Sequence, residues 1–355
     1  MTIGLSHGGS TIYSSATPSN RLLVGTAAGV VTLERDGPRW HVSERALDSL
    51  HISAIVLPAP DLVVAAAFED TVYVSTDGGT TWEERGQGIA HRHVFSLAAI
   101  PRGGSWRLYA GTEPAHLYVS DDLGRSWAEL PGLRSVPSVP RWWFPAPPKI
   151  AHLKHVVPDP LDWHSLYACI EQGALLRSRD EGQTWEELSG YDEDVHVLTI
   201  HPRDPGRLRL TCGIGFYSSD DGGTTWRRHT DQASPVGGYP DLLVVHPRQS
   251  DLLFMSAGGS EPGVWRKTHR ADARVSVSRD GGRTWEVLTR GISDHLAGSI
   301  EAMCLEDWGS SFSLFVGTTD GQVHASEDGG ESWAQIASGL PAIAKWGHDR
   351  ALLGL

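Results

Sequence analysis

One eight-residue phrase recurs along this chain and limits the folds that the chain can adopt. The phrase ends in tryptophan and occurs six times: STDGGTTW at 75–82, SDDLGRSW at 120–127, SRDEGQTW at 178–185, SDDGGTTW at 219–226, SRDGGRTW at 278–285 and SEDGGESW at 326–333. A degraded seventh copy, RDGPRW, lies at 35–40. The closing tryptophans are spaced about 49 residues apart on average, which is the size of one propeller blade.

The residues around each phrase predict short strands joined by tight turns. Runs such as TVYVS and HLYVS precede the phrases with the alternation of a half-buried strand. The Asp-x-Gly core suits a tight turn, because aspartate bonds its own backbone and glycine supplies a positive φ. Two further strand-like runs lie upstream, and no helical periodicity is found. The sequence therefore predicts an all-β fold, with one seven-bladed β-propeller domain over 1–355.

The repeated phrase resembles the Asp-box (BNR) repeat, S-x-D-x-G-x-T-W, which is known from sialidases, sortilin-type receptors, photosystem assembly propellers and many bacterial YVTN/BNR-like proteins. Six near-complete copies, with one degraded copy, make the resemblance specific for the fold. The resemblance implies little about function, because activities differ widely among propellers that carry this box.

Composition excludes several classes of partner. The formal net charge of −13 disfavours non-specific binding to nucleic acid or to anionic membranes. No run of about 18 apolar residues predicts a transmembrane helix, and the first ten residues do not resemble a secretory signal. Three cysteines without a CxxC pair favour a reducing compartment. We therefore expect a cytoplasmic protein that acts on a small molecule, with the oligomeric state left open.

Two insertions are expected on one face of the propeller. The segment 131–150 lengthens the connection between two blades, and 258–274 lengthens the connection between the second and third strands of a later blade. Both should project from the face where the inner strands begin and the channel opens, opposite the Asp boxes. Long loops on one face of a rigid scaffold often carry function. We expect four aromatic side chains of these insertions to line a substrate pocket: Trp142, Trp143, Phe144 and Trp265.

Histidines open four consecutive inner strands, in HISAIVLP, HVFSLAAIP, HLKHVVPDP and HVLTIHPRDP. They are His51, His93, His152 and His196. Hairpin arithmetic places a glutamate opposite each of the first three, and the expected partners are Glu69, Glu113 and Glu171. The fourth histidine is expected opposite Gly213 and has no acid partner.

The next two inner strands begin with acids instead. Asp241 and Glu301 occupy this position, and the same arithmetic pairs Glu301 with Asp320. These three residues are expected as additional members of the site. Four further histidines lie nearby and could replace a predicted ligand: His7, His91, His116 and His155.

This pattern predicts a transition-metal site on the propeller axis. Neutral imidazoles suit iron, copper or zinc, and a carboxylate on the other ring nitrogen fixes each imidazole. The arrangement is similar to that of the carotenoid cleavage oxygenases, whose ferrous ion is held by four histidines, three of them backed by glutamates; the motifs of that family are absent here. The resulting hypothesis is a non-haem metal oxidoreductase or oxygenase, with iron favoured over copper or zinc, acting on a partly apolar or aromatic substrate.

Other functions remain open at this point. A metal ion at the same site could activate water for hydrolysis, or support a lyase reaction. A non-catalytic binding scaffold would explain the boxes and the loops. Glycoside hydrolysis would need two positioned carboxylates, and Glu69, Glu113, Glu171 and Glu301 are candidates. Sialidase activity is not expected, because the chain has no Arg-Ile-Pro motif and its inner strands begin with histidine rather than arginine.

Overall fold

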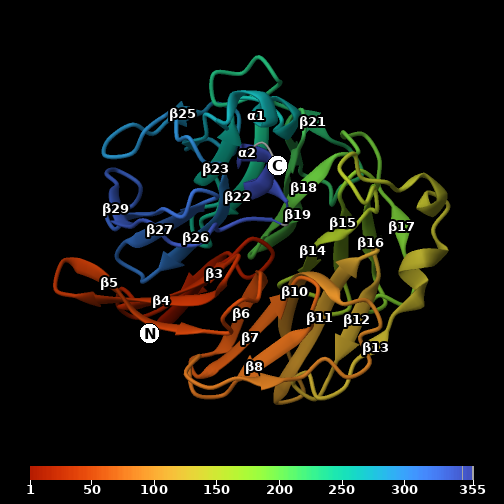
Figure 1. Ribbon diagram of the computed structural model, residues 1–355. Coiled ribbons are helices and arrows are strands. Elements are labelled where there is room, and N and C mark those ends of the chain that lie inside the picture. The colour runs from red at the N-terminus through yellow and green to blue at the C-terminus, as the bar shows by residue number, and fades with distance from the viewer. Residues whose placement is uncertain (346, 354–355) are drawn as a thin grey trace.

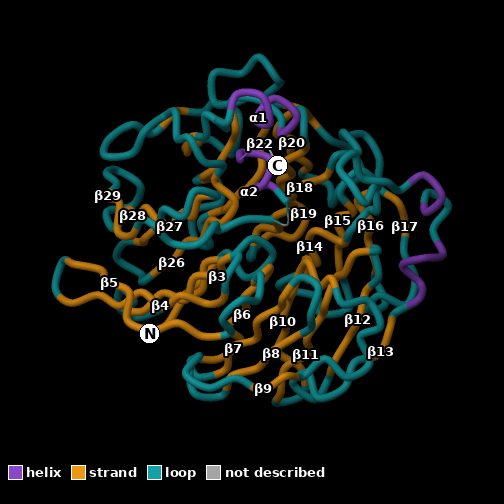
Figure 2. Tube along the Cα trace, viewed as in Figure 1, coloured by secondary structure: helices purple, strands orange, loops and turns teal. Residues whose placement is uncertain are grey.

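Seven small sheets surround a central axis in the computed structural model, which describes residues 1–345 and 347–353 (Figure 1). Six sheets have four strands and one has five. Strands account for nearly all of the regular structure, and Figure 2 shows them radiating from the axis. The predicted all-β seven-bladed propeller is confirmed.

Within each blade the strands follow one another from the axis outwards. The first three blades are β1 (Thr2–Leu5), β3 (Arg21–Thr26), β4 (Gly29–Asp36) and β5 (Arg39–Ala46); β6 (Ile52–Ala59), β7 (Leu62–Ala67), β8 (Val72–Ser75) and β9 (Glu83–Glu84); and β10 (His93–Arg102), β11 (Ser105–Glu113), β12 (Leu117–Ser120) and β13 (Ala128–Glu129).

The other four blades repeat this order. They are β14 (Leu153–Pro158), β15 (Leu166–Ile170), β16 (Ala174–Ser178) and β17 (Glu186–Glu187); β18 (Val195–His201), β19 (Asp204–Cys212), β20 (Gly215–Ser219) and β21 (Arg227–Arg228); β22 (Tyr239–Val245), β23 (Leu253–Gly258), β24 (Arg274–Ser278) and β25 (Glu286–Val287); and β26 (Ile300–Asp307), β27 (Phe312–Thr318), β28 (Val323–Ser326) and β29 (Ala334–Ala337), with β2 (Ile12–Ser14) inside β26.

Both ends of the chain close the ring. Strand β1 pairs in parallel with β3 in the first blade, and β2 pairs in parallel with β26 in the last. The segment after β29 then crosses between these two blades, since Ile343 N donates to Thr318 O and Ala27 N donates to Ala342 O. In Figure 1 the C-terminal segment accordingly ends near the middle of the ring.

Each Asp box forms the turn between the third and fourth strands of a blade. In the first clear box, the Ser75 hydroxyl donates to Asp77 Oδ1 and accepts from Gly79 N, while Thr81 N donates to the same carboxylate at 2.9 Å. The same three kinds of bond occur in the other five boxes, which are built on Asp122, Asp180, Asp221, Asp280 and Asp328. A short outer strand follows each tryptophan, as predicted.

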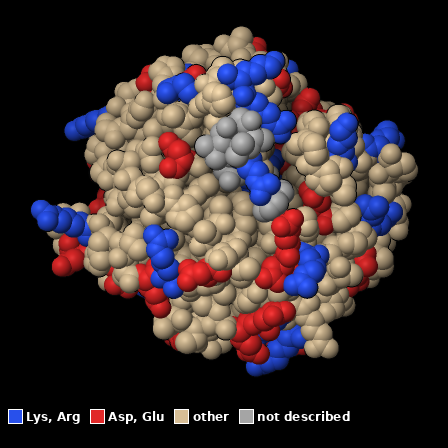
Figure 3. Space-filling model, in the orientation of Figure 1, with Lys and Arg blue, Asp and Glu red and all other residues tan. Residues whose placement is uncertain are grey.

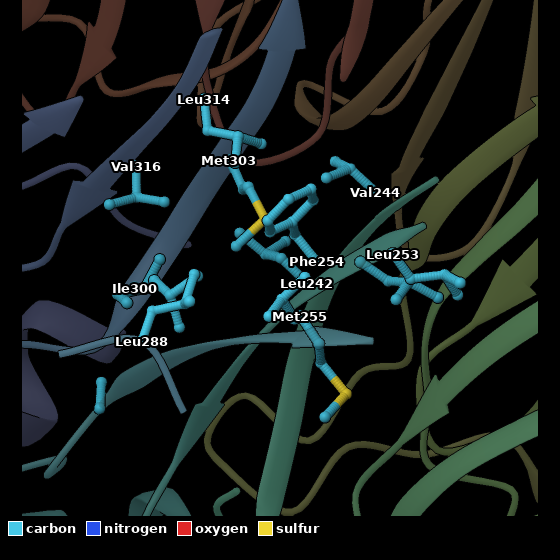
Figure 4. Close-up of a cluster of buried hydrophobic side chains, with 14 of the residues drawn as sticks. Leu242, Val244, Leu253, Phe254, Met255, Leu288, Ile300, Met303, Leu314 and Val316 are labelled. Atoms are coloured by element: carbon cyan, nitrogen blue, oxygen red, sulfur yellow. The ribbon is translucent and has the colours of Figure 1, made fainter. Parts of the chain in front are cut away.

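Apolar side chains fill the wedges between neighbouring blades. Figure 4 shows one such cluster, in which Phe254 and Met255 of β23 and Met303 of β26 lie among aliphatic side chains. These residues come from the second strand of one blade and from β26 of the next blade, and they are buried. This packing holds the inner strand ends in fixed positions around the channel mouth.

The insertions contain short helices that the sequence did not predict. The 131–150 insertion holds two 3-10 helices, η1 (Pro131–Ser135) and η2 (Val139–Arg141), and the 258–274 insertion holds α1 (Pro262–Thr268). Helix α1 begins with proline in its first turn and ends at His269, which has left-handed backbone geometry. Helix α2 (His348–Leu353) packs against α1. Among the described residues, none of these helices is long and apolar enough to span a membrane.

Candidate functional site

A cavity of about 480 Å³ opens where the inner strands begin. Its walls come from the inner-strand ends of blades three to six, from 144–148, from α1 and from the C-terminal segment. Aromatic rings of Phe95, Phe144 and Tyr239 line it together with several prolines. Side chains of both charges gather around this face of the molecule (Figure 3). The cavity has the size and mixed lining of a small-molecule site.

The four aromatic residues of the insertions have different positions. Phe144 lines the cavity, with its ring edge-on to the His152 ring at a centroid distance of 5.0 Å. Trp142 packs against the core of blade four and donates from Nε1 to Ser138 Oγ, whereas Trp143 is 48% exposed. Trp265 is fully buried and supports the wall from behind by an edge contact with Tyr239. One of the four residues expected in the pocket therefore lines the cavity.

His152 lies on the cavity floor in the position that the hairpin arithmetic predicted. It directly precedes β14, and its backbone carbonyl accepts a hydrogen bond from Glu171 N across the hairpin. Its Nε2 is 2.5 Å from Glu171 Oε2, and its ring stacks on Phe95 at 3.9 Å between centroids. Its Nδ1 has no hydrogen-bond partner among the described residues and is 3.5 Å from Glu113 Oε2.

Glu171 is held by two lysines as well as by His152. Lys345 Nζ donates to both carboxylate oxygens at 2.6 and 2.8 Å, and Lys154 Nζ is 3.5 Å away. Burial raises the pKa of Glu171, but the charges of Lys154 and Lys345, followed by His152, outweigh it and keep that pKa well below its usual range. Glu171 is therefore a fixed carboxylate that anchors the floor of the cavity.

His93 faces Glu113 as predicted, whereas His51 does not face Glu69. The register of β10 and β11 places His93 opposite Glu113, and His93 Nδ1 is 3.6 Å from the carboxylate. Opposite His51 lies Phe68, because Phe68 N donates to His51 O. Glu69 follows in a left-handed turn with φ of 57° and contacts His93 of the next blade at 3.9 Å. His51 itself donates from Nε2 to Ala344 O.

His196 has carboxylate neighbours that the hairpin arithmetic missed. It lies at a bulge between β18 and β19, so that Gly213 N bonds Asp194 O instead of the histidine. Its Nδ1 donates to Pro240 O at 2.6 Å. Its buried Nε2 has no hydrogen-bond partner in the part of the chain that the structure describes, and it is 3.5 Å from Asp194 Oδ1 and 3.8 Å from Glu171 Oε1.

The four predicted ligands do not converge on one point. Among the described residues, the group whose possible metal-binding atoms lie within 4.8 Å of one another is Glu171, Asp194 and His196, which includes one of the four histidines. The ammonium groups of Lys154 and Lys345 lie against Glu171 at this place and supply the positive charge that a metal would bring. One bound transition metal stays a prediction, which elemental analysis of the purified protein would test.

The acids of the last two blades serve other contacts. Asp241 bonds Lys154 Nζ at 2.9 Å, and this charge keeps the pKa of Asp241 below its usual range although burial raises it. Glu301 does not pair with Asp320; its carboxylate accepts from Lys345 N at 2.6 Å and from His348 Nδ1 at 2.5 Å. Asp320 instead bonds Thr318 Oγ1 at 2.5 Å. Glu301 is therefore an attachment point for the C-terminal segment.

The alternative histidines divide into an inner and an outer pair. His7 and His155 are buried, and burial, followed by the charge of Lys154, lowers the pKa of His155 to about 4. His91 and His116 stack on each other at 4.1 Å between centroids, and His116 bonds Glu129 beside the outer strand β13. None of the four lines the cavity.

Sequence reasoning missed Lys154, Asp194, Lys345 and His348. Lys154 had a recognisable signal, because it is a charged residue inside the otherwise apolar inner strand β14 and is fully buried. Buried lysines are nearly always paired. Lys345 and His348 lie in the C-terminal segment, whose place was left open by the sequence. Asp194 became visible only through the bulge that turns it toward His196.

Two family models match the chain. The model described as BNR/Asp-box repeat matches residues 73–84, and the one described as Sortilin, neurotensin receptor 3 matches residues 173–300. The first match falls on the turn whose hydrogen bonds recur in six blades. The chain is a BNR/Asp-box repeat propeller.

Curated relatives of this propeller include xyloglucanases. It is 23% identical over 251 residues to a probable oligoxyloglucan-reducing end-specific xyloglucanase of Neosartorya fischeri, covering 65% of this chain and 27% of that protein. It is 25% identical over 268 residues to the corresponding enzyme of Emericella nidulans, covering 61% of this chain and 31% of that protein. The chain thus spans less than a third of the length of these relatives.

Solved structures support the propeller fold. An ancestral GH74 enzyme superposes with a TM-score of 0.64 at 17% identity, covering 81% of this chain and 38% of that one. YCF48 bound to D1 peptide superposes with a TM-score of 0.52 at 17% identity, covering 92% and 88% of the two chains. At these identities the likeness concerns the fold alone.

The predicted metal-dependent oxidoreductase is wrong. The curated relatives include several xyloglucanases, which are glycoside hydrolases and not metal-dependent oxidoreductases. The prediction followed from four histidines that were expected to share one axis. The structure instead separates them by carboxylates, of which Glu113 and Glu171 were expected, and by lysines that the sequence analysis had not placed there.

Proposed function

We propose that this Asp-box propeller binds a short carbohydrate in the mouth cavity and hydrolyses a glycosidic bond there, with Glu113 and Asp194 as the pair of carboxylates. The observation that carries the proposal is the cavity itself. Both carboxylates line it, together with Phe95, Phe144 and Tyr239. Aromatic faces suit the apolar faces of sugar rings, and glycoside hydrolysis requires two carboxylates beside the scissile bond.

Of the other carboxylates near the cavity, Glu261 is exposed at its lip, and Glu171 and Glu301 are committed to structural contacts. Glu171 is bonded to Lys345 and His152, and Glu301 is bonded to the C-terminal segment. By contrast, the ion pairs of the described residues include no Lys or Arg nitrogen on Glu113 or Asp194. These two carboxylates are therefore available for a substrate.

Histidine side chains lie beside the two proposed carboxylates. Glu113 lies between His93 at 3.6 Å and His152 at 3.5 Å, and Asp194 lies 3.5 Å from His196. Both members of the proposed pair therefore have an imidazole within 3.6 Å.

The xyloglucanase relatives support a carbohydrate as the substrate class, and the proposal carries their reaction type to this chain. The first experiment is a reducing-sugar assay on neutral, acidic and amino oligosaccharides, with a sialoside included as a substrate that should not be cleaved. Hydrolysis of at least one oligosaccharide is the expected result.

Two conservative variants then test the residue assignment. Glu113→Gln and Asp194→Asn should each lower kcat by about 10²–10⁴-fold, because each removes a group that transfers a proton or attacks the substrate. Glu84→Gln, on the exposed outer strand β9, is the matched control and should retain full activity. Full activity in either cavity variant, or a panel without any cleaved sugar, would overturn the proposal.

A further inference from the structure

Negative charge exceeds positive charge around the cavity. Glu113, Asp194 and Glu261 line it, and Glu171 and Glu301 bond directly to its lining residues. The permanently cationic side chains of the lining are Arg266, Lys345 and Arg350. The charge of Lys345 is already neutralised by Glu171. The remaining charge at the cavity floor is therefore the negative charge of Glu113 and Asp194, which have no lysine or arginine partner among the described residues.

Glu113 is the clearest sign of a missing partner. Its side chain is only 7% exposed, yet no hydrogen bond to its carboxylate is formed within 1–345 and 347–353. The nearest donors are imidazole nitrogens at 3.5 and 3.6 Å, beyond good hydrogen-bond distance. Because Glu113 lines the cavity, a ligand there can supply the donors that this carboxylate lacks among the described residues.

The chain itself shows which group this environment accepts. The Lys345 ammonium is buried at the cavity floor, where Glu171 binds it at 2.6 and 2.8 Å. The same ammonium lies 4.9 Å from the centroid of the Phe144 ring, a cation–π distance. The carboxylate of Glu171 and the ring of Phe144 together thus hold one ammonium of the protein. In the cavity lining, the carboxylates of Glu113 and Asp194 and the ring of Tyr239 offer the same two kinds of group to a ligand.

We propose that the ligand of this cavity is an oligosaccharide of amino sugars, whose primary ammonium groups are bound by Glu113 and Asp194 while its rings pack on the aromatic walls. This inference rests on the proposed function for the sugar and adds the charge that the sugar carries. An ammonium donates up to three hydrogen bonds, so each of these carboxylates can be satisfied by an ammonium of its own. A neutral sugar hydroxyl at the same place supplies weaker, uncharged hydrogen bonds.

Three trisaccharides that differ only at C2 test the inference: a β-1,4-linked glucosamine trimer, its fully N-acetylated counterpart and cellotriose. Isothermal titration calorimetry at low salt should give a Kd for the glucosamine trimer about tenfold or more below the other two, the ratio that one charge-assisted hydrogen bond supplies. Added salt should narrow this gap, because it screens charge and leaves neutral contacts unchanged.

Variants of the cavity carboxylates show which residues cause the preference for the glucosamine trimer. Asp194→Asn and Glu113→Gln should each reduce the preference for the glucosamine trimer over cellotriose, measured as the ratio of the two Kd values. Glu261→Gln, at an exposed position of the cavity lip, should have a smaller effect, and Glu84→Gln should have none. Circular dichroism of each variant separates a lost fold from a lost preference.

The outcomes distinguish this inference from the proposed function. Equal or tighter binding of cellotriose or of the N-acetylated trimer overturns the amino-sugar assignment, even when neutral oligosaccharides are hydrolysed through Glu113 and Asp194. A preference for the glucosamine trimer that depends on these two residues, without hydrolysis, supports the assignment and overturns catalysis.

Discussion

The two faces of the propeller are built in different ways. On the Asp-box face, six turns repeat the same serine, aspartate and glycine hydrogen bonds between residues at most four apart in sequence. On the mouth face, homologous positions hold histidine or an acid, and their partners come from other blades or from the C-terminal segment. The first face is determined by local contacts and the second by long-range contacts. The same substitution should therefore have the same effect on stability in every box, whereas equivalent substitutions at different mouth positions should have different effects.

The largest effect should come from removing one ammonium group at the mouth. Lys345→Met leaves Glu171 buried with a weaker set of partners, and losing one member of a buried ion pair costs about 3–5 kcal/mol. Urea denaturation measures the loss in unfolding free energy. Lys267→Met, an exposed lysine on α1, is the control. A Lys345 variant as stable as this control would show that the mouth is not held together by its charges.

The second-largest loss of stability is expected from substituting a glycine of an Asp box. A Cβ at Gly282 would lie 2.2 Å from Phe216 Cε1, and the backbone φ there is +93°. We expect Gly282→Ala to cost about 2–4 kcal/mol, from overpacking plus left-handed strain. Gly330→Ala, at the equivalent place of the next box, should behave alike, since its Cβ would meet Phe254 at 2.7 Å with φ of +90°.

Gly263→Ala provides the control for both, because it lies within α1 and meets no atom closer than 3.5 Å. Alanine is the better helix former, so this variant should be neutral or slightly stabilising. Thermal unfolding of the three glycine variants measures the order of their stabilities. Different costs at the two box glycines would break the claim that boxes are equivalent.

The box aspartate should have a smaller and pH-dependent effect. Burial raises the pKa of Asp280, but hydrogen bonds from Thr284 and Ser278 outweigh this effect and lower the pKa to about 2. Because the folded value lies below the unfolded value near 4, the contribution is present above about pH 4 and is lost as the pH falls toward 2.

Asp280→Asn should therefore cost about 1 kcal/mol at neutral pH and flatten the acid limb of the stability profile. Urea denaturation at intervals from pH 7 to pH 2 measures both quantities. Asp221→Asn should act in the same direction, since hydrogen bonds from Thr225 lower the pKa of Asp221 to about 2. An unchanged acid limb in both variants would refute the assigned role.

The smallest effect should be found in the insertion above the mouth. Trp143 is 48% exposed, so Trp143→Ala should change the unfolding free energy by less than about 0.5 kcal/mol. Trp142→Ala is the contrasting variant, because its ring packs on the core of blade four, and it should cost clearly more. Equal losses at the two positions would mean that the insertion folds as a single unit over the cavity.

Part of the candidate site was predictable because it follows from strand register. Pairing along β10 and β11 places His93 opposite Glu113, and pairing along β14 and β15 places His152 opposite Glu171. The arithmetic failed at His51 and His196, where register shifts between Ile52 and Ala54 and between Val195 and Val197 change the residue that lies opposite. A one-residue slip changes which side chain faces its partner, and short turns between strands decide it.

The sequence by itself determined the propeller, because each Asp box closes its own turn with residues that are neighbours in the chain and each tryptophan marks the next outer strand. Only the tertiary structure decided what occupies the mouth. Lys345 reaches Glu171 across 174 positions of sequence, and Glu113 meets His152 of the following blade. No local periodicity encodes such contacts, since they arise when the ring closes and the C-terminal segment crosses the channel. The same imidazoles that suggested a metal centre are therefore distributed among carboxylates and ammonium groups.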